Sequence, residues 1–177
     1  MNKADIITRL RDGKKAHLTW VTHAHALVEG LGVGQEKVPV HGTECGFGCW
    51  YYGAGQVLSP LAAFRKVEDP HLKLHDIYLE IHKLLRVADK EDTSGLFGRM
   101  LGSGKKLAEE KAAAQARAHT LFTELKMVSK DIAGHLDELQ QQLIEMDDAK
   151  FAALLSAQGV AAPVHASIVT FRQRATA

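Results

Sequence analysis

The feature that most constrains the fold is a long apolar stripe between residues 106 and 148. Apolar side chains recur there in alternating steps of four and three: Leu121, Leu125, Val128, Ile132, Leu136, Leu139, Leu143 and Met146. This spacing places them on one face of an α-helix. Such a helix would be roughly 60 Å long. Because this exceeds the length of a compact bundle, we expect part of the helix to pair with a second copy of the chain.

Shorter helices are predicted before this stripe. Residues 3–30 carry a helical face made of Leu10, His17, Val21, Ala24, Val28 and Leu31, and glycines follow it. A short helix is expected within residues 44–55. Ser59 followed by Pro60, and Asp69 followed by Pro70, are typical helix starts. They predict a short helix to about residue 66 and a longer one to about residue 88.

These segments predict an all-α fold, a four-helix bundle with an additional short helix and a long C-terminal helix. We expect the bundle to span residues 1–148, with a flexible glycine-containing loop over residues 92–105. Residues 149–177 are predicted to form a C-terminal tail with one short helix at 151–158.

The composition excludes several classes of protein. Lys and Arg number 22 and Asp and Glu 21, and this balance argues against nucleic-acid binding, which needs clustered positive charge. No apolar run reaches the length of a membrane span, and the first residues lack the apolar core of a secretory signal. Two cysteines do not make a disulfide framework. A cytoplasmic protein is therefore expected.

Four residues form a candidate metal site. His71 and His75 are four apart, so a helix places both on one face. His17 lies on the apolar face of the first predicted helix, and Cys45 lies in a third segment. One thiolate and three imidazoles would fill the tetrahedral shell of Zn²⁺. A filled shell leaves no place for a bound water nucleophile, so the site is not expected to be that of an enzyme.

Each of these residues also has a simpler interpretation. A histidine on an apolar stripe, such as His17, is more often a core residue than a ligand. A buried cysteine, such as Cys45, usually packs as a small hydrophobic residue. We expect Cys49 to be a packed core residue, with a spare ligand or a resolving thiol as alternatives. His82 is expected on the surface or in the core rather than beside the site.

The motifs taken together resemble the chemoreceptor zinc-binding domain, or CZB, family. They are His17 before Trp20, then Cys45 with Phe47, Gly48 and Trp50, then His71 with His75. The resemblance implies a homodimeric bundle with one zinc per subunit, held by His17, Cys45, His71 and His75. It also implies a bacterial sensory module that responds to zinc or to cysteine oxidation. Members of the family are attached to chemoreceptor signalling regions or diguanylate cyclases.

The sequence therefore predicts a zinc-binding sensory or regulatory module that acts on a signalling partner. One alternative is a structural helical adaptor that dimerises without a functional metal. Another is a di-iron bundle protein, which needs inward glutamates and two Glu-x-x-His motifs. Only Glu68 and His71 have that spacing here, and Pro70 interrupts it.

Overall fold

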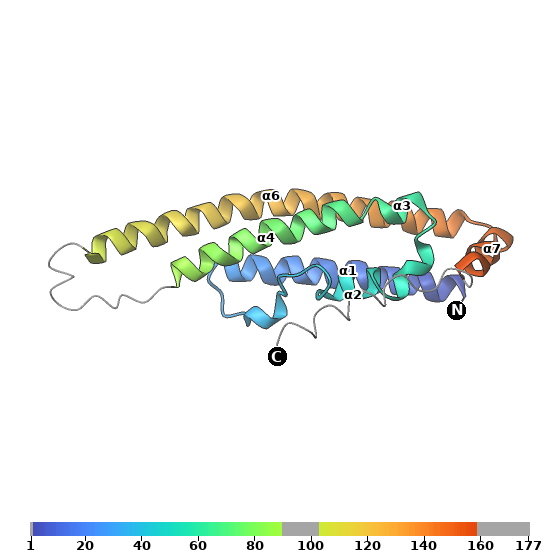
Figure 1. Ribbon diagram of the computed structural model, residues 1–177, viewed down its shortest axis with the longest axis horizontal. Helices are drawn as coiled ribbons and strands as arrows, with labels where there is room; N and C mark the ends of the chain where they lie inside the picture. Colours follow the sequence, from blue (N-terminus) through green and yellow to red (C-terminus); the bar gives the residue numbers. More distant parts are fainter. Residues whose placement is uncertain (1, 90–102, 159–177) are drawn as a thin grey trace, which may run out of the picture.

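The computed structural model describes residues 2–89 and 103–158, and their regular secondary structure is helical. Three long helices, α1 (Lys3–Val28), α4 (Glu68–Ala88) and α6 (Ser103–Glu145), lie side by side in an elongated bundle (Figure 1). The predicted all-α bundle is confirmed. Most of the loop predicted at 92–105, and the tail from residue 159, lie outside the described residues.

Helix α1 begins and ends at local signals in the sequence. The Asn2 side chain accepts a hydrogen bond from the Asp5 amide, and the Asp5 carboxylate accepts one from the Asn2 amide. This capping box satisfies two amides that the helix itself leaves unpaired. The helix ends at Val28, and Gly30 follows with φ of 70°. The predicted inward position of Leu31 was wrong, because it lies beyond the helix end and is exposed.

The chain between α1 and α4 forms short helical segments. They are η1 (Gln35–Lys37), α2 (Gly46–Tyr51), η2 (Ala54–Leu58) and α3 (Ala62–Arg65). Helix α2 packs against α1, and α3 packs against α6. The short segments thereby cover the sides of the bundle that the long helices leave open.

Both predicted proline starts were misplaced by two residues. Helix α3 begins at Ala62, after Pro60, and α4 begins at Glu68, before Pro70. Proline is tolerated at Pro70 because amides in the first helical turn have no partner within the helix. Residues Ser59 and Pro60 instead form a turn, and their carbonyl groups accept hydrogen bonds from the Arg65 guanidinium.

Helix α6 supplies much of the core, as its apolar stripe predicts. Its main contacts are with α4 and then with α1. Its buried face consists of Ala114, Ala118, Phe122, Leu125, Val128, Ser129, Ile132, Leu136, Leu139 and Leu143. Ion pairs from Lys66 to Glu138 and from Lys73 to Glu124 join α6 to the preceding helices at the surface. The first part of α6, to residue 113, buries none of its described side chains and extends past the end of α4 (Figure 1).

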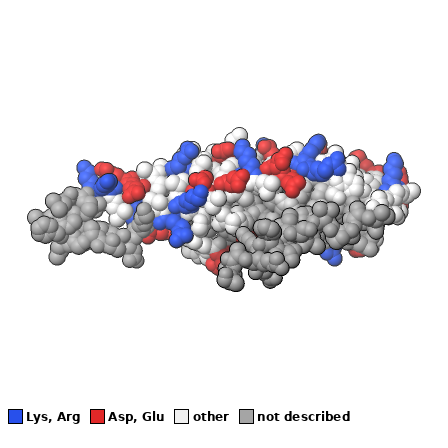
Figure 2. Space-filling model, in the orientation of Figure 1, with Lys and Arg blue, Asp and Glu red and all other residues white. Residues whose placement is uncertain are grey.

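A final helix, α7 (Asp148–Gln158), begins three residues before the short helix predicted in the tail. It packs against η2, and Phe151 is buried in the core. No helix in the described residues is long and apolar enough to cross a membrane. On the face that Figure 2 shows, acidic and basic side chains are interspersed along the described helices.

Candidate metal centre

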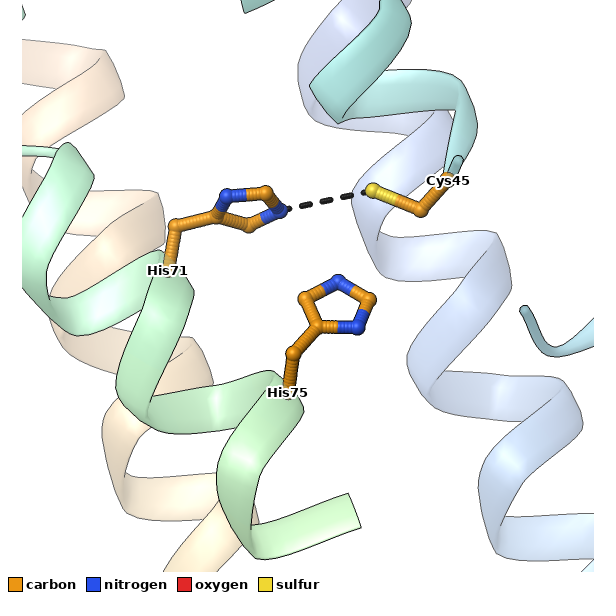
Figure 3. A group of neighbouring side chains, drawn as sticks. All are labelled: Cys45, His71 and His75. Atoms are coloured by element: carbon orange, nitrogen blue, oxygen red, sulfur yellow. Dashed lines mark hydrogen bonds between the residues drawn. The ribbon is translucent and has the colours of Figure 1, made fainter. Parts of the chain in front are cut away.

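Three of the four predicted ligands converge in the core. Cys45, His71 and His75 are all buried, and one potential ligand atom from each lies within 4.8 Å of the other two. The Sγ atom of Cys45 is 3.3 Å from Nε2 of His71. Figure 3 shows the three side chains pointing toward one common space, two from α4 and one from the start of α2. The group therefore connects two separate segments of the bundle.

Cys45 is held in place by the backbone around it. It is the N-cap residue of α2, and its sulfur accepts a hydrogen bond of 3.1 Å from the Gly48 amide. A side chain at Gly48 would be impossible without movement, because its Cβ would lie 1.7 Å from the Gly42 carbonyl oxygen. This close approach lets the chain before α2 fold back over the helix start. Gly48 is therefore a structural requirement for the position of the thiol.

His71 and His75 lie on one face of α4 because they are four residues apart. His75 Nδ1 donates a hydrogen bond of 2.8 Å to the Val40 carbonyl group, so its Nε2 carries the lone pair. Figure 3 shows that this second nitrogen points between Cys45 and His71. Nδ1 of His71 is buried and has no hydrogen-bond partner among the described residues. An outer hydrogen bond of the kind that His75 makes is typical of metal-binding histidines.

Burial sets the protonation of the group. It lowers the pKa of His71 to about 3, with His75 and His17 contributing, and it also lowers the pKa of His75. Burial raises the pKa of the Cys45 thiol, although the amides of Gly48 and Phe47 partly offset this. At neutral pH the imidazoles are therefore neutral and able to ligate a metal, whereas the thiol must first lose its proton.

The donor set fits Zn²⁺. Sulfur and nitrogen ligands of a tetrahedral zinc are about 3.5 Å apart, given bond lengths of about 2.3 and 2.0–2.1 Å. The observed separation between Cys45 and His71 is 3.3 Å. The group contains no carboxylate among the described residues, and Glu68 is exposed at the start of α4. Soft thiolate and imidazole ligands favour zinc over magnesium or calcium.

His17, the fourth predicted ligand, lies near the group but is not a member of it. It is buried, and its Nε2 makes a hydrogen bond of 2.9 Å with the Ser129 hydroxyl. Phe47 contacts both rings, with centroid distances of 6.1 Å to His17 and 4.8 Å to His71. Burial lowers the pKa of His17 to about 4, and the charge of His75 contributes to this shift. A ligand role for His17 stays a prediction.

Aromatic rings shield the centre from water. The Trp20 ring is 4.7 Å from that of His75, and its indole nitrogen donates a hydrogen bond to the Pro39 carbonyl group. The Trp50 ring packs against those of Phe47 and Phe64. A small cleft of about 250 Å³ lies beside His75 and is lined also by His41 and Asp76.

Two secondary expectations have different outcomes. Cys49 is exposed and lies outside the group, so its predicted core position was wrong. The six-residue α2 buries Phe47, Gly48 and Tyr51 on its inner face, which turns Cys49 outward. His82 is half-buried, with its ring 6.3 Å from that of Tyr78, and it too lies outside the group.

Two polar contacts, one made by His17 and one by His75, were not predicted from the sequence. Ser129 lies between Leu125 and Ile132 on the apolar face of α6. A polar residue at helical spacing within such a face could have predicted a buried polar contact. The Val40 carbonyl group gave no signal, because any residue type supplies a carbonyl. Its role depends only on the path of the loop before α2.

One of the comparisons with known proteins gives a match. Residues 17–82 match the family model described as the chemoreceptor zinc-binding domain, and the match includes all four predicted ligands. Neither the curated proteins nor the solved structures include a match to the chain. Over residues 17–82 the chain is therefore similar to the chemoreceptor zinc-binding domain family.

Proposed function

We propose that this protein is a bacterial, cytoplasmic zinc-binding sensory module without catalytic activity. The observation that carries the proposal is the convergence of Cys45, His71 and His75, whose potential ligand atoms lie within 4.8 Å of one another. His17 is the proposed fourth ligand. Zinc, when bound, supplies a crosslink between helices and no reactive water, because a shell of four protein ligands has no open position.

In this proposal the signal is the gain or loss of zinc, which changes how firmly the helices are held together. Without a metal, a thiol and the imidazoles face one another in the core, so zinc binding and bundle stability are coupled. Loss of zinc, or oxidation of the Cys45 thiolate, removes a ligand that joins the start of α2 to α4. The output passes to a signalling partner of the chemoreceptor or diguanylate cyclase type.

We also propose that the protein is a homodimer that pairs along α6. The first part of α6, to residue 113, buries none of its described side chains and extends past the end of α4. A helix that extends beyond its own bundle is available to a second chain. Sedimentation analysis is expected to give twice the mass of the chain, and a monomer at all concentrations would contradict this part of the proposal.

Thermal melting with and without a chelator tests the function. We expect zinc to raise the melting temperature of the wild type, because a ligand that binds only the folded state stabilises it. In His71→Ala the same addition should have little effect. His23→Ala is a matched control, because His23 is a half-exposed histidine of α1 outside the metal group. If the chelator leaves wild-type melting unchanged and no zinc is bound, a structural helical adaptor is the better interpretation.

A further inference from the structure

The cleft beside His75 meets the metal centre at Gly42. Both residues line this hollow of about 250 Å³, which lies between α4 and the loop before α2. A Cβ at Gly42 would lie 3.3 Å from a ring carbon of His71 and 3.3 Å from one of His75. The absence of a side chain at Gly42 therefore leaves space next to both imidazole rings, at the wall of the cleft.

The backbone itself does not require glycine at position 42. Gly30 alone among the described glycines has a positive φ. A side chain at position 42 would thus meet no strain from the backbone conformation. What glycine provides at this position is the space against the two rings.

The other contacts of the imidazoles are with large rings of the core. The Trp20 ring is 4.7 Å from that of His75, and the Phe47 ring is 4.8 Å from that of His71. Of the three converging ligands, Cys45 is 2% exposed, His71 0% and His75 5%. The most exposed ligand of the centre is therefore the one that lines the cleft.

The cleft also carries two exposed residues of the kinds that bind zinc, His41 and Asp76. Burial lowers the pKa of His75, and His41 adds to this shift whereas Asp76 opposes it, so both lie within electrostatic reach of that ring. Burial of an unpaired charge is very costly, so a divalent cation needs ligands along its path into the core. An imidazole and a carboxylate beside His75 supply them.

We propose that this cleft is the route of zinc exchange, in which His41 and Asp76 bind the ion in passage and Gly42 leaves the opening to the buried histidines. The Asp76 carboxylate attracts the cation, and the His41 imidazole replaces part of its water shell. His75 is then the first of the buried ligands to bind. This inference rests on the proposed zinc-binding function, and it concerns the rates of binding rather than the final ligand set.

The rates of zinc uptake and release in His41→Ala test the route. Uptake is measured by mixing metal-free protein with a zinc salt buffered by a chromophoric chelator, and release by mixing zinc-loaded protein with excess chelator. A residue that binds the ion only in passage affects both rates equally. We expect both to fall about 5-fold, the equivalent of one lost contact of hydrogen-bond strength, with the affinity unchanged. His23→Ala, outside both the metal group and the cleft, should behave like the wild type.

Two outcomes for His41→Ala would overturn the route. Rates equal to those of the wild type would make His41 a bystander. A loss of affinity with an unchanged uptake rate would make it a ligand of the bound metal. Absence of zinc binding in the wild type would overturn the proposed function and this inference with it, whereas normal binding with unchanged variant rates overturns the inference alone.

The charge at the cleft has its own test in Asp76→Asn. We expect uptake to slow about 10-fold at low ionic strength, because a carboxylate in a cleft raises the local concentration of cations. The difference should shrink as salt is added. Asp69→Asn is the matched control, because it removes the same charge from an exposed position of α4 outside the cleft. Equal slowing in the two variants would show an effect of overall charge and overturn the role of the cleft.

The opening at Gly42 is tested by Gly42→Ala. The added methyl group would lie against the rings of His71 and His75, so we expect uptake to slow about 5-fold or more. Gly32→Ala is the matched control in the same inter-helix segment, because nothing lies within 4 Å of a Cβ there. Circular dichroism establishes that both variants are folded. Uptake by Gly42→Ala at or above the wild-type rate would mean that zinc enters elsewhere, and would overturn the route.

Discussion

Cys45 and His71 are 26 residues apart in the sequence, yet Sγ and Nε2 lie 3.3 Å apart in the core. The thiol comes from the N-cap of α2 and the imidazole from α4, so neither helix positions both groups. Their approach depends on the glycine at position 48 and on the packing of α2 against α1. A bond from a shared metal would therefore fix the relative positions of these segments.

Removal of the two thiols should have unequal effects. Cys45→Ala is expected to weaken zinc binding on the order of 100-fold or more. The corresponding loss of binding free energy is about a quarter of the ~12 kcal/mol typical of a structural zinc site. Cys49→Ala should retain zinc, because Cys49 is exposed and lies outside the group. Metal analysis after dialysis against a chelator measures both. Equal loss of zinc in the two variants would contradict the assignment.

Zinc binding should release one proton per ion near neutral pH. Burial raises the pKa of Cys45, so its thiol is protonated before the metal binds. Because burial lowers the pKa values of His71 and His75, their imidazoles hold no proton that competes. Calorimetric titration in buffers of different ionisation enthalpy counts the protons. Release of none, or of two or more, would be inconsistent with a ligand set of one thiol and neutral imidazoles.

The metal-free protein should lose stability as the pH falls below about 6.5. Burial lowers the pKa of His17 to about 4 and that of His71 to about 3, from an ordinary value of 6.5. Between these values the unfolded chain binds protons that the folded protein does not, so acid favours unfolding. Each histidine contributes up to about 1.4 kcal/mol per pH unit to this loss.

Urea unfolding of the metal-free protein at about pH 7 and about pH 5 measures this dependence. His71→Gln, which has no titrating ring, should show a smaller change between the two conditions. The same free energy of unfolding at both pH values in the wild type would contradict the burial of neutral histidines.

A methyl group at position 48 should disrupt the fold locally. In Gly48→Ala the new Cβ would lie 1.7 Å from the Gly42 carbonyl oxygen, so the loop must move. We expect a loss of about 1–3 kcal/mol of stability and weaker zinc binding, since the Gly48 amide donates to the sulfur of Cys45.

Gly134→Ala is the matched control for this substitution. Nothing lies within 4 Å of a Cβ at Gly134, which is inside helix α6. Alanine there should stabilise the protein by about 0.8–1 kcal/mol, as expected for a helix interior. If the two substitutions had similar effects on urea unfolding, the close approach at Gly48 would not be a structural requirement.

The sequence predicted the helices better than their ends. The apolar stripe of α6 and the pair His71 and His75 follow from helical spacing alone, and both are as expected. The starts at Pro60 and Pro70 were misplaced, because proline is compatible with several positions near a helix start. Local signals of this kind cannot distinguish the first helical residue from the third.

The site could be predicted only in part for a related reason. Spacing within one helix brings His71 and His75 together, but the position of Cys45 depends on how α2 packs. The bond between His17 and Ser129 joins residues 112 apart and depends on the register of α1 against α6. No pattern within either helix encodes that register, so the contact appears only in the folded structure.

X-ray absorption at the zinc edge tests the central claim most directly. For the zinc-loaded wild type we predict one sulfur ligand at about 2.3 Å and nitrogen ligands at about 2.0–2.1 Å. Cys45→Ala, if loaded at high zinc, should lose the sulfur signal, and Cys49→Ala should keep it. A shell of nitrogen and oxygen alone in the wild type, or a sulfur signal that disappears with Cys49, would contradict a zinc centre built on Cys45, His71 and His75.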